Sequence, residues 1–260
     1  MLDKSQIRRY EQDGALLVDG VFDAGEVEIL RAAGDRIAHQ ERANVTPEAA
    51  GSSARMVHGA HAYEPAFTQL CRHPRLIEPA MQLIGTGLYV HQSRLNYNAG
   101  LGTGGFDWHQ DYSTWHNIDG LAEPRAMMIA VFLDDVDATN GPLLYIPGSH
   151  NEGLIDDFEP VEDATGNVLM KLSANRLRQM VERGGIVAGT GRAGSVLFMH
   201  CNLVHGSSAN ISPRRRSLFY VNVNSVENPQ TTFKRAEYHA GSDFSPIIPA
   251  DDGCLLPLTV

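Results

Sequence analysis

From residue 88 onward, the sequence alternates short strand-like runs with turns rich in Gly, Pro and Asp. The predicted strands cover residues 88–98, 126–133, 143–146, 195–200 and 216–224. Short runs bounded by turn residues are typical of antiparallel barrels and sandwiches, and here helical patterns precede them. We therefore predict a mainly β fold, a double-stranded β-helix (a cupin-like jelly roll) with flanking N-terminal α-helices.

The first 87 residues are predicted to be largely helical. Ser5 is the expected N-cap of a first helix, and Asp23 is the expected N-cap of a second. A third helical region over 64–84 is expected to be interrupted by Pro74 and Pro79, because proline removes a backbone donor. Residues 44–62, between the second and third helical regions, are expected to be irregular.

No internal repeat or low-complexity linker divides the chain, so we predict a single domain over residues 1–260. It would consist of a helical part at 1–87 and a jelly-roll core at 88–240. Within that core, residues 151–192 are polar and include a predicted helix from Ser173 to Glu182. This stretch is the candidate for an insertion or lid.

Composition excludes several classes of partner. The chain has 31 acidic and 21 basic residues, a net charge of −10, which argues against binding a nucleic-acid backbone. Its three cysteines (Cys71, Cys201 and Cys254) include no CxxC pair, so neither a disulfide framework nor a structural zinc site is expected. The polar N-terminus has no apolar h-region and the sequence has no long apolar run, so we expect a cytoplasmic protein with no membrane partner. We also expect a monomer or homodimer with a small-molecule substrate.

The candidate chemistry centres on His109-Gln-Asp111. Strand side chains alternate between two faces, so on a strand His109 and Asp111 would point the same way. One imidazole and one carboxylate supply two thirds of the facial triad that binds non-haem Fe(II) and leaves open positions. His-x-Asp triplets also occur by chance, so a third ligand and a suitable fold are needed.

The third ligand has four candidates after the predicted strands: His150, His200, His205 and His239. His205 follows a strand and precedes Arg216 by eleven residues, and a barrel could bring their two strands side by side. An iron site that uses 2-oxoglutarate needs such an arginine to hold the far carboxylate bidentately. A structural histidine and a surface arginine would give the same sequence, but the combination with His-x-Asp favours the functional interpretation.

The predicted strand at 88–98 carries Gln92, Arg94 and Asn96 on one face. The opposite face is not cleanly apolar, so this polar face fits either a solvated surface or a cavity wall. His58 and His61 are interpreted as loop histidines rather than metal ligands, because no carboxylate lies beside them at ligand spacing.

With these motifs together, the sequence resembles the phytanoyl-CoA dioxygenase superfamily of Fe(II)/2-oxoglutarate oxygenases, and within it ectoine hydroxylases and a bacterial L-leucine 5-hydroxylase. The resemblance covers roughly residues 88–238. It rests on His91-Gln-Ser-Arg-Leu-Asn96, Phe106-x-Trp-His-x-Asp111, Thr114-Trp-His116, Asn140-Gly-Pro-Leu143, Ile146-Pro-Gly-Ser-His150 and His205-Gly-Ser-Ser208.

The resemblance implies a role for each matching residue. His109, Asp111 and His205 match the iron ligands. The 2-oxoglutarate contacts correspond to Ser207, Arg216, Gln92 and Asn96, and the substrate contacts to Phe106, Trp115, Arg94 and Arg235. The implied cofactors are Fe(II), 2-oxoglutarate as cosubstrate, and O2. Asp111 argues against a halogenase, whose chloride needs that ligand position vacant.

The implied function is hydroxylation of an unactivated C–H in a small free amino acid or similar zwitterion. Three alternatives stay open: an ectoine 5-hydroxylase, an enzyme that cyclises, epimerises or hydroxylates a natural product, and a cupin-like metal-binding protein without turnover. Gln110, Tyr112 and Ser113 depart from the ectoine hydroxylase pattern. A long thioester substrate would need an apolar channel and a basic patch, which this acidic chain does not indicate.

Overall fold

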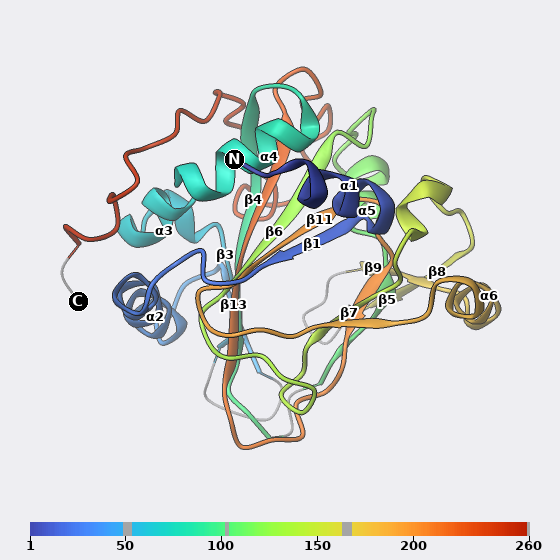
Figure 1. Cartoon of the computed structure of the whole chain (residues 1–260), viewed down its shortest axis with the longest axis horizontal. Helices are drawn as coiled ribbons and strands as arrows, with labels where there is room; N and C mark the ends of the chain where they lie inside the picture. The colour runs from blue at the N-terminus through green and yellow to red at the C-terminus, as the bar shows by residue number, and fades with distance from the viewer. Residues whose placement is uncertain (49–53, 102–103, 163–167, 259–260) are drawn as a thin grey trace.

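The computed structural model describes residues 1–48, 54–101, 104–162 and 168–258 (Figure 1). Within them most helices come first and most strands follow, as the sequence predicts. The α-helices are α1 (Lys4–Asp13), α2 (Ala24–Ala38), α3 (Pro65–Leu70), α4 (Pro74–Ile84), α5 (Asp111–Asn117) and α6 (Ala174–Gly184), with short 3-10 turns η1 (Ala60–Ala62) and η2 (Ser149–Glu152). The strands are β1 (Ala15–Val18), β2 (Val45–Pro47), β3 (Ala54–His58), β4 (Leu88–Asn98), β5 (Phe106–His109), β6 (Ala126–Phe132), β7 (Leu143–Tyr145), β8 (Phe158–Glu162), β9 (Val168–Leu172), β10 (Val187–Gly189), β11 (Val196–His200), β12 (His205–Ser207) and β13 (Arg216–Ser225).

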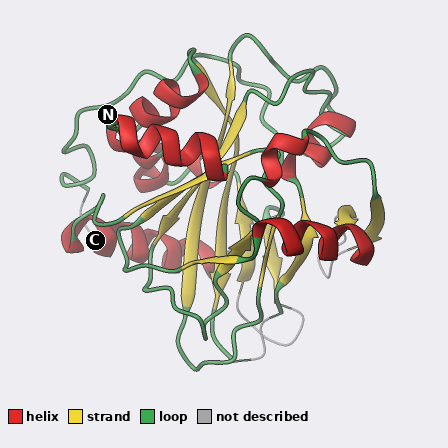
Figure 2. Cartoon of the chain, turned by 45° about the vertical axis from the view of Figure 1, so that its right-hand side comes forward, coloured by secondary structure: helices red, strands yellow, loops and turns green. Residues whose placement is uncertain are grey.

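Two antiparallel sheets form the core of the fold. The larger sheet has the order β1-β11-β6-β13-β4-β3-β2, and the smaller has the order β10-β7-β12-β5. Strands β8 and β9 form a separate hairpin beside β5. Apolar side chains of the two main sheets meet in a shared cluster, so the sheets face each other as in a jelly roll. The predicted mainly β fold is confirmed, and Figure 2 shows the helices outside the sheets.

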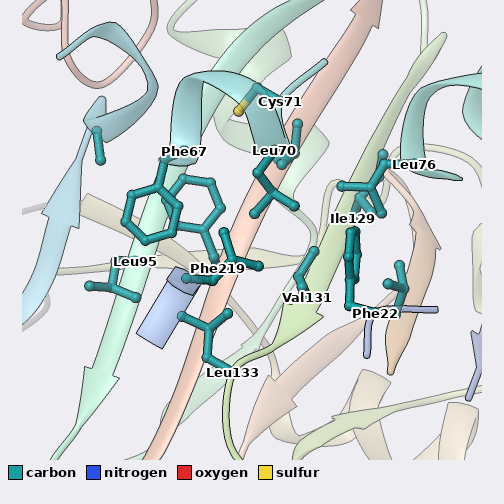
Figure 3. Packing of buried hydrophobic residues seen from close by; sticks show 14 of the residues in the cluster. Phe22, Phe67, Leu70, Cys71, Leu76, Leu95, Ile129, Val131, Leu133 and Phe219 are labelled. Atoms are coloured by element: carbon teal, nitrogen blue, oxygen red, sulfur yellow. The ribbon is translucent and has the colours of Figure 1, made fainter. Parts of the chain in front are cut away.

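The main core lies between the N-terminal helices and one face of the larger sheet (Figure 3). Phe67 of α3 stacks on Phe219 of β13, with ring centroids 4.0 Å apart. Ile129 of β6 packs into this cluster, whereas its neighbour Met128 packs into the cluster between the two sheets. Strand β6 is therefore buried on both faces, which explains why its sequence is continuously apolar rather than alternating.

Three local predictions in the N-terminal part are wrong. Helix α1 is capped by Asp3 rather than Ser5, because the Asp3 carboxylate accepts hydrogen bonds from two backbone N–H groups of the first turn. The described residues of the stretch 44–62 are not irregular, since β2 and β3 lie there and pair at the edge of the larger sheet. The interruption at Pro74 is confirmed, because α3 ends at Leu70 and α4 begins at Pro74, but the interruption expected at Pro79 is wrong, since Pro79 lies inside α4.

Among the described residues, no helix combines the length and the apolar character needed to cross a membrane.

The predicted helix in the 151–192 stretch is present as α6, and Ser173 caps it through a hydrogen bond from the backbone N–H of Arg176.

Candidate active site

His109, Asp111 and His205 meet at one end of the smaller sheet. His109 and His205 are register partners on neighbouring strands β5 and β12, with ring centroids 4.3 Å apart. Nε2 of His109 lies 3.4 Å from Oδ1 of Asp111, and one ligand atom from each of the three side chains lies within 4.8 Å of the others. All three side chains are buried.

Backbone carbonyls orient both imidazoles. Nδ1 of His109 is 2.7 Å from the carbonyl oxygen of Asp107, and Nδ1 of His205 is 3.0 Å from that of Leu203. A carbonyl can only accept, so each Nδ1 must carry the proton, and each Nε2 lone pair is left for a metal. Burial, then the neighbouring His109, lowers the pKa of His205 to about 4, so its ring is neutral near pH 7.

Asp111 completes the set as an ionised carboxylate. Burial alone would raise the pKa of Asp111, but the neighbouring His109, then His205 and Arg94, hold it below its ordinary value. Its Oδ2 atom is buried and has no hydrogen-bond partner within the described part of the chain. An unpaired buried carboxylate oxygen beside two imidazole nitrogens fits a divalent cation.

The predicted local structure around these residues is wrong in one respect. Strand β5 ends at His109, and Asp111 begins helix α5, so the two do not lie on one strand. Gln110 holds the turn between them by donating to the carbonyl oxygens of Gly153 and Asn202 and accepting from the N–H of Ile155. The imidazole and carboxylate therefore meet through this braced turn and not through strand alternation.

A cavity of about 250 Å³ surrounds the triad. Every residue that the sequence singled out for the site lines it: His109, Asp111, His205, Gln92, Arg94, Asn96, Phe106, Trp115, Ser207, Arg216 and Arg235. The polar face of β4 is thus a cavity wall, which decides between the two interpretations left open above. Of the other three histidines weighed as third ligand, His239 lines the cavity, whereas His150 and His200 do not.

Arg216 reaches this cavity from the opposite sheet. Its strand, β13, pairs with β4 and β6, so the expectation that it lies beside the strand of His205 is wrong. The guanidinium is buried against the turn at Gly141, where an added Cβ would lie 3.3 Å from Nη2. Its Nε has no hydrogen-bond partner in the described chain, and neither does the buried Oδ1 of Asn96. Burial lowers the pKa of Arg216, which a bound anion would oppose.

Ser207 lies across the cavity from Arg216, on β12. Its hydroxyl oxygen accepts a hydrogen bond of 3.0 Å from the backbone N–H of Phe106, which leaves its proton available to a ligand. A carboxylate between Ser207 and Arg216 would satisfy donors that the protein itself does not use.

The two candidate substrate arginines differ in their partners. Arg235 donates to Asp119, with Nε 2.8 Å from Oδ1, and His91 also contacts this carboxylate at 3.1 Å. Burial would raise the pKa of Asp119, but these two hydrogen bonds lower it, so Asp119 neutralises Arg235. Arg94 instead lies 4.8 Å from the Tyr220 ring centroid, and its buried Nε has no partner among the described residues.

Sequence reasoning missed other residues of the cavity wall. Tyr220 shares the cavity face of β13 with Arg216, four positions away, so strand alternation could have identified it. The interpretation of His58 as a loop histidine is wrong, because it lies on β3 and lines the cavity; the strand was missed since that segment was expected to be irregular.

A family model described as phytanoyl-CoA dioxygenase matches residues 10–218. The chain belongs to the phytanoyl-CoA dioxygenase family. The family predicted from the motifs is therefore confirmed, and with it the class of Fe(II)/2-oxoglutarate-dependent dioxygenases.

Two curated proteins and one crystal structure show what the chain is similar to. It is 37% identical over 236 residues to the ectoine dioxygenase of Bordetella bronchiseptica, covering 87% of this chain and 77% of that protein. It is 34% identical over 253 residues to the L-proline trans-4-hydroxylase of Streptomyces griseoviridis, covering 94% of each. The crystal structure of EctD from S. alaskensis with 2-oxoglutarate and 5-hydroxyectoine superposes with a TM-score of 0.84 at 30% identity, over 96% of this chain and 87% of that one.

Proposed function

We propose that this dioxygenase binds Fe(II) through His109, Asp111 and His205 and holds 2-oxoglutarate against Arg216. The observation that carries the proposal is the set of three converging ligand atoms, two of them on histidines whose protons are fixed on Nδ1. The unpartnered Nε of Arg216 and the Ser207 hydroxyl supply donors for the distal carboxylate of 2-oxoglutarate. Gln92 and Asn96 line the same cavity.

The substrate that we propose is a small free amino acid or a similar zwitterion. A cavity of about 250 Å³ must hold both cosubstrate and substrate, which leaves no space for a long thioester. Phe106 and Trp115 provide apolar walls, and Arg94 provides a charged donor. Relatives named ectoine dioxygenase and L-proline trans-4-hydroxylase support a compact, amino-acid-like substrate.

In this proposal, bound iron supplies oxidation coupled to 2-oxoglutarate: substrate, 2-oxoglutarate and O2 give hydroxylated substrate, succinate and CO2. The chain's own residues provide placement. Arg216 and Ser207 orient the cosubstrate, Arg94 fixes the carboxylate of the substrate, and the aromatic walls direct one C–H toward the metal and exclude water. No protein acid or base is required.

A screen of free amino acids, including L-proline and L-leucine, together with ectoine tests this function. With Fe(II), 2-oxoglutarate and O2, we expect one compound to gain the mass of one oxygen atom while succinate forms. A natural-product tailoring enzyme would release succinate above background with none of these compounds. With the compound that the enzyme oxidises, Arg94→Met should weaken substrate binding more than Arg235→Met, because Asp119 already pairs with Arg235.

A further inference from the structure

His58 is a buried histidine on the wall of the active-site cavity. It ends strand β3, where it is the register partner of Arg94 on β4. Met56, two residues earlier, also lines the cavity, so strand alternation directs the His58 side chain the same way. Register partners on an antiparallel pair have neighbouring side chains, so His58 and Arg94 form one continuous patch of wall.

Neither ring nitrogen of His58 has a hydrogen-bond partner within the described residues, although the side chain is only 3% exposed. Leaving a buried polar group unpaired costs free energy that folding does not recover. The Nε of Arg94 beside it is also buried and unpartnered in the same part of the chain. Two adjacent groups in this condition, facing one cavity, indicate a ligand that satisfies both.

The charges around His58 define what that ligand carries. Besides Arg94, the His239 ring lies 4.3 Å away, centroid to centroid, and Arg235 lies on the same cavity. Burial, then His239, Arg94 and Arg235, holds the pKa of His58 well below its ordinary value, so the ring is neutral. A neutral imidazole offers one N–H, and beside the Arg94 guanidinium an anionic acceptor suits it best.

We propose that His58 is a substrate-recognition residue whose N–H donates a hydrogen bond to the same substrate carboxylate that Arg94 binds. This inference rests on the proposed function, because it assumes a substrate with a carboxylate. It assigns the patch formed by β3 and β4, rather than the Arg235–Asp119 pair, as the carboxylate subsite. Substrate selection would then depend on a residue from the edge hairpin of the larger sheet.

Melting of the ligand-free protein separates recognition from a structural role. His58→Leu removes both unpaired nitrogens and adds an apolar side chain next to Met56. Because nothing in the described chain bonds to the ring, the variant should melt at the same or a higher temperature than the wild type. A fall of more than about 4 °C would show that His58 supports the fold instead and would overturn the proposal.

Steady-state kinetics with ectoine and L-proline as probe substrates are the second test of the proposal. In the enzyme loaded with Fe(II) and 2-oxoglutarate, His58→Leu should raise the KM of the oxidised probe roughly 10-fold or more, since a hydrogen bond to a charged group is lost. The KM for 2-oxoglutarate should not change. His58→Asn, which keeps an N–H donor, should recover part of the loss. An unchanged probe KM in His58→Leu contradicts the proposal.

His61→Leu is the matched control. His61 follows His58 by three residues, but its ring contacts Ser93 Oγ at 2.7 Å and it lines a different cavity, so its replacement should leave the probe KM unchanged. A wild-type enzyme that oxidises none of the screened compounds would contradict the proposed function. The melting comparison would still decide whether the fold requires His58.

Discussion

At the scale of single residues, the triad is defined by hydrogen bonds that lie outside it. Carbonyl oxygens of Asp107 and Leu203 select the tautomers of the two histidines, and Asp111 supplies the carboxylate. Asp111→Ala should therefore leave two imidazole ligands, which bind Fe(II) weakly without the carboxylate. We expect most of the bound iron and nearly all turnover to be lost, as measured by metal analysis of the reconstituted protein alongside succinate formation. Normal iron content with normal hydroxylation would contradict the assignment.

Arg216→Lys tests the cosubstrate site. The substitution keeps one positive charge but loses the planar fork that matches a carboxylate. We expect the KM for 2-oxoglutarate to rise about 10-fold or more while the KM for the substrate changes little, measured by varying each at saturating levels of the other. The neighbouring Arg214 and Arg215 pair with acidic side chains instead. Arg215→Lys is therefore the control, and an equal effect of both changes would move the anchor away from Arg216.

Site residues could be predicted from the sequence where a motif indicates their chemistry, as with His109 and Asp111. The partners of a site residue in the folded chain could not be predicted. The ion pair of Arg235 with Asp119 joins residues 116 positions apart, and nothing in the local sequence indicates it. The same holds for His58, whose exposure to the cavity depends on a hairpin with little local signal.

At the scale of secondary structure, β5 shows how pairing changes a predicted pattern. His205 pairs with His109, but Ser207 pairs with Phe106, so β5 has one extra residue there. This irregularity lets Phe106 and His109, three residues apart, both line the cavity, which regular alternation forbids. The bounds of β4 were predicted to the residue, and those of β6 and β13 to within one residue, whereas a bulge depends on the partner strand.

Within residues 151–192, β9 and α6 pack beside β5, whereas β10 pairs with β7 as a strand of the smaller sheet. Trp108 contacts the apolar cluster of this stretch, and Lys171 forms a 2.9 Å ion pair with Asp107, while none of the described residues of the stretch lines the cavity. We expect this segment to become more ordered when the cavity is filled, because β5 carries His109 on its inner side. Limited proteolysis should then cut within 151–192 more slowly after Fe(II), 2-oxoglutarate and substrate are added. Equal cleavage rates with and without ligands would count against a lid.

At the scale of the whole molecule, buried histidines link stability to pH. Burial, then the neighbouring His150, lowers the pKa of His200 from 6.5 to about 4, and its Nδ1 accepts a 3.0 Å hydrogen bond from the N–H of Asn202. Between these two pKa values the unfolded chain binds the proton and the folded chain does not. The stability contributed by neutral His200 is therefore complete above pH 6.5 and is lost as the pH falls toward 4.

Urea unfolding of the wild type and of His200→Gln at pH 7 and pH 4.5 measures this contribution. The wild type should lose about 2–3 kcal/mol more than the variant between the two pH values. Equal losses in both proteins would show that His200 takes up its proton as readily when folded as when unfolded.

The overall architecture was the most predictable feature, because the sheets need only strands of the right length and periodicity separated by turn residues. The chemistry needs its own test. In the cavity between the sheets, one oxygen atom of O2 is inserted into a small substrate while 2-oxoglutarate is decarboxylated to succinate. The direct measurement is a reaction under ¹⁸O2 with Fe(II), 2-oxoglutarate and the oxidised compound, read by mass spectrometry. We predict one ¹⁸O atom in the hydroxylated product and one in succinate, and a product or succinate without the label would contradict the claim.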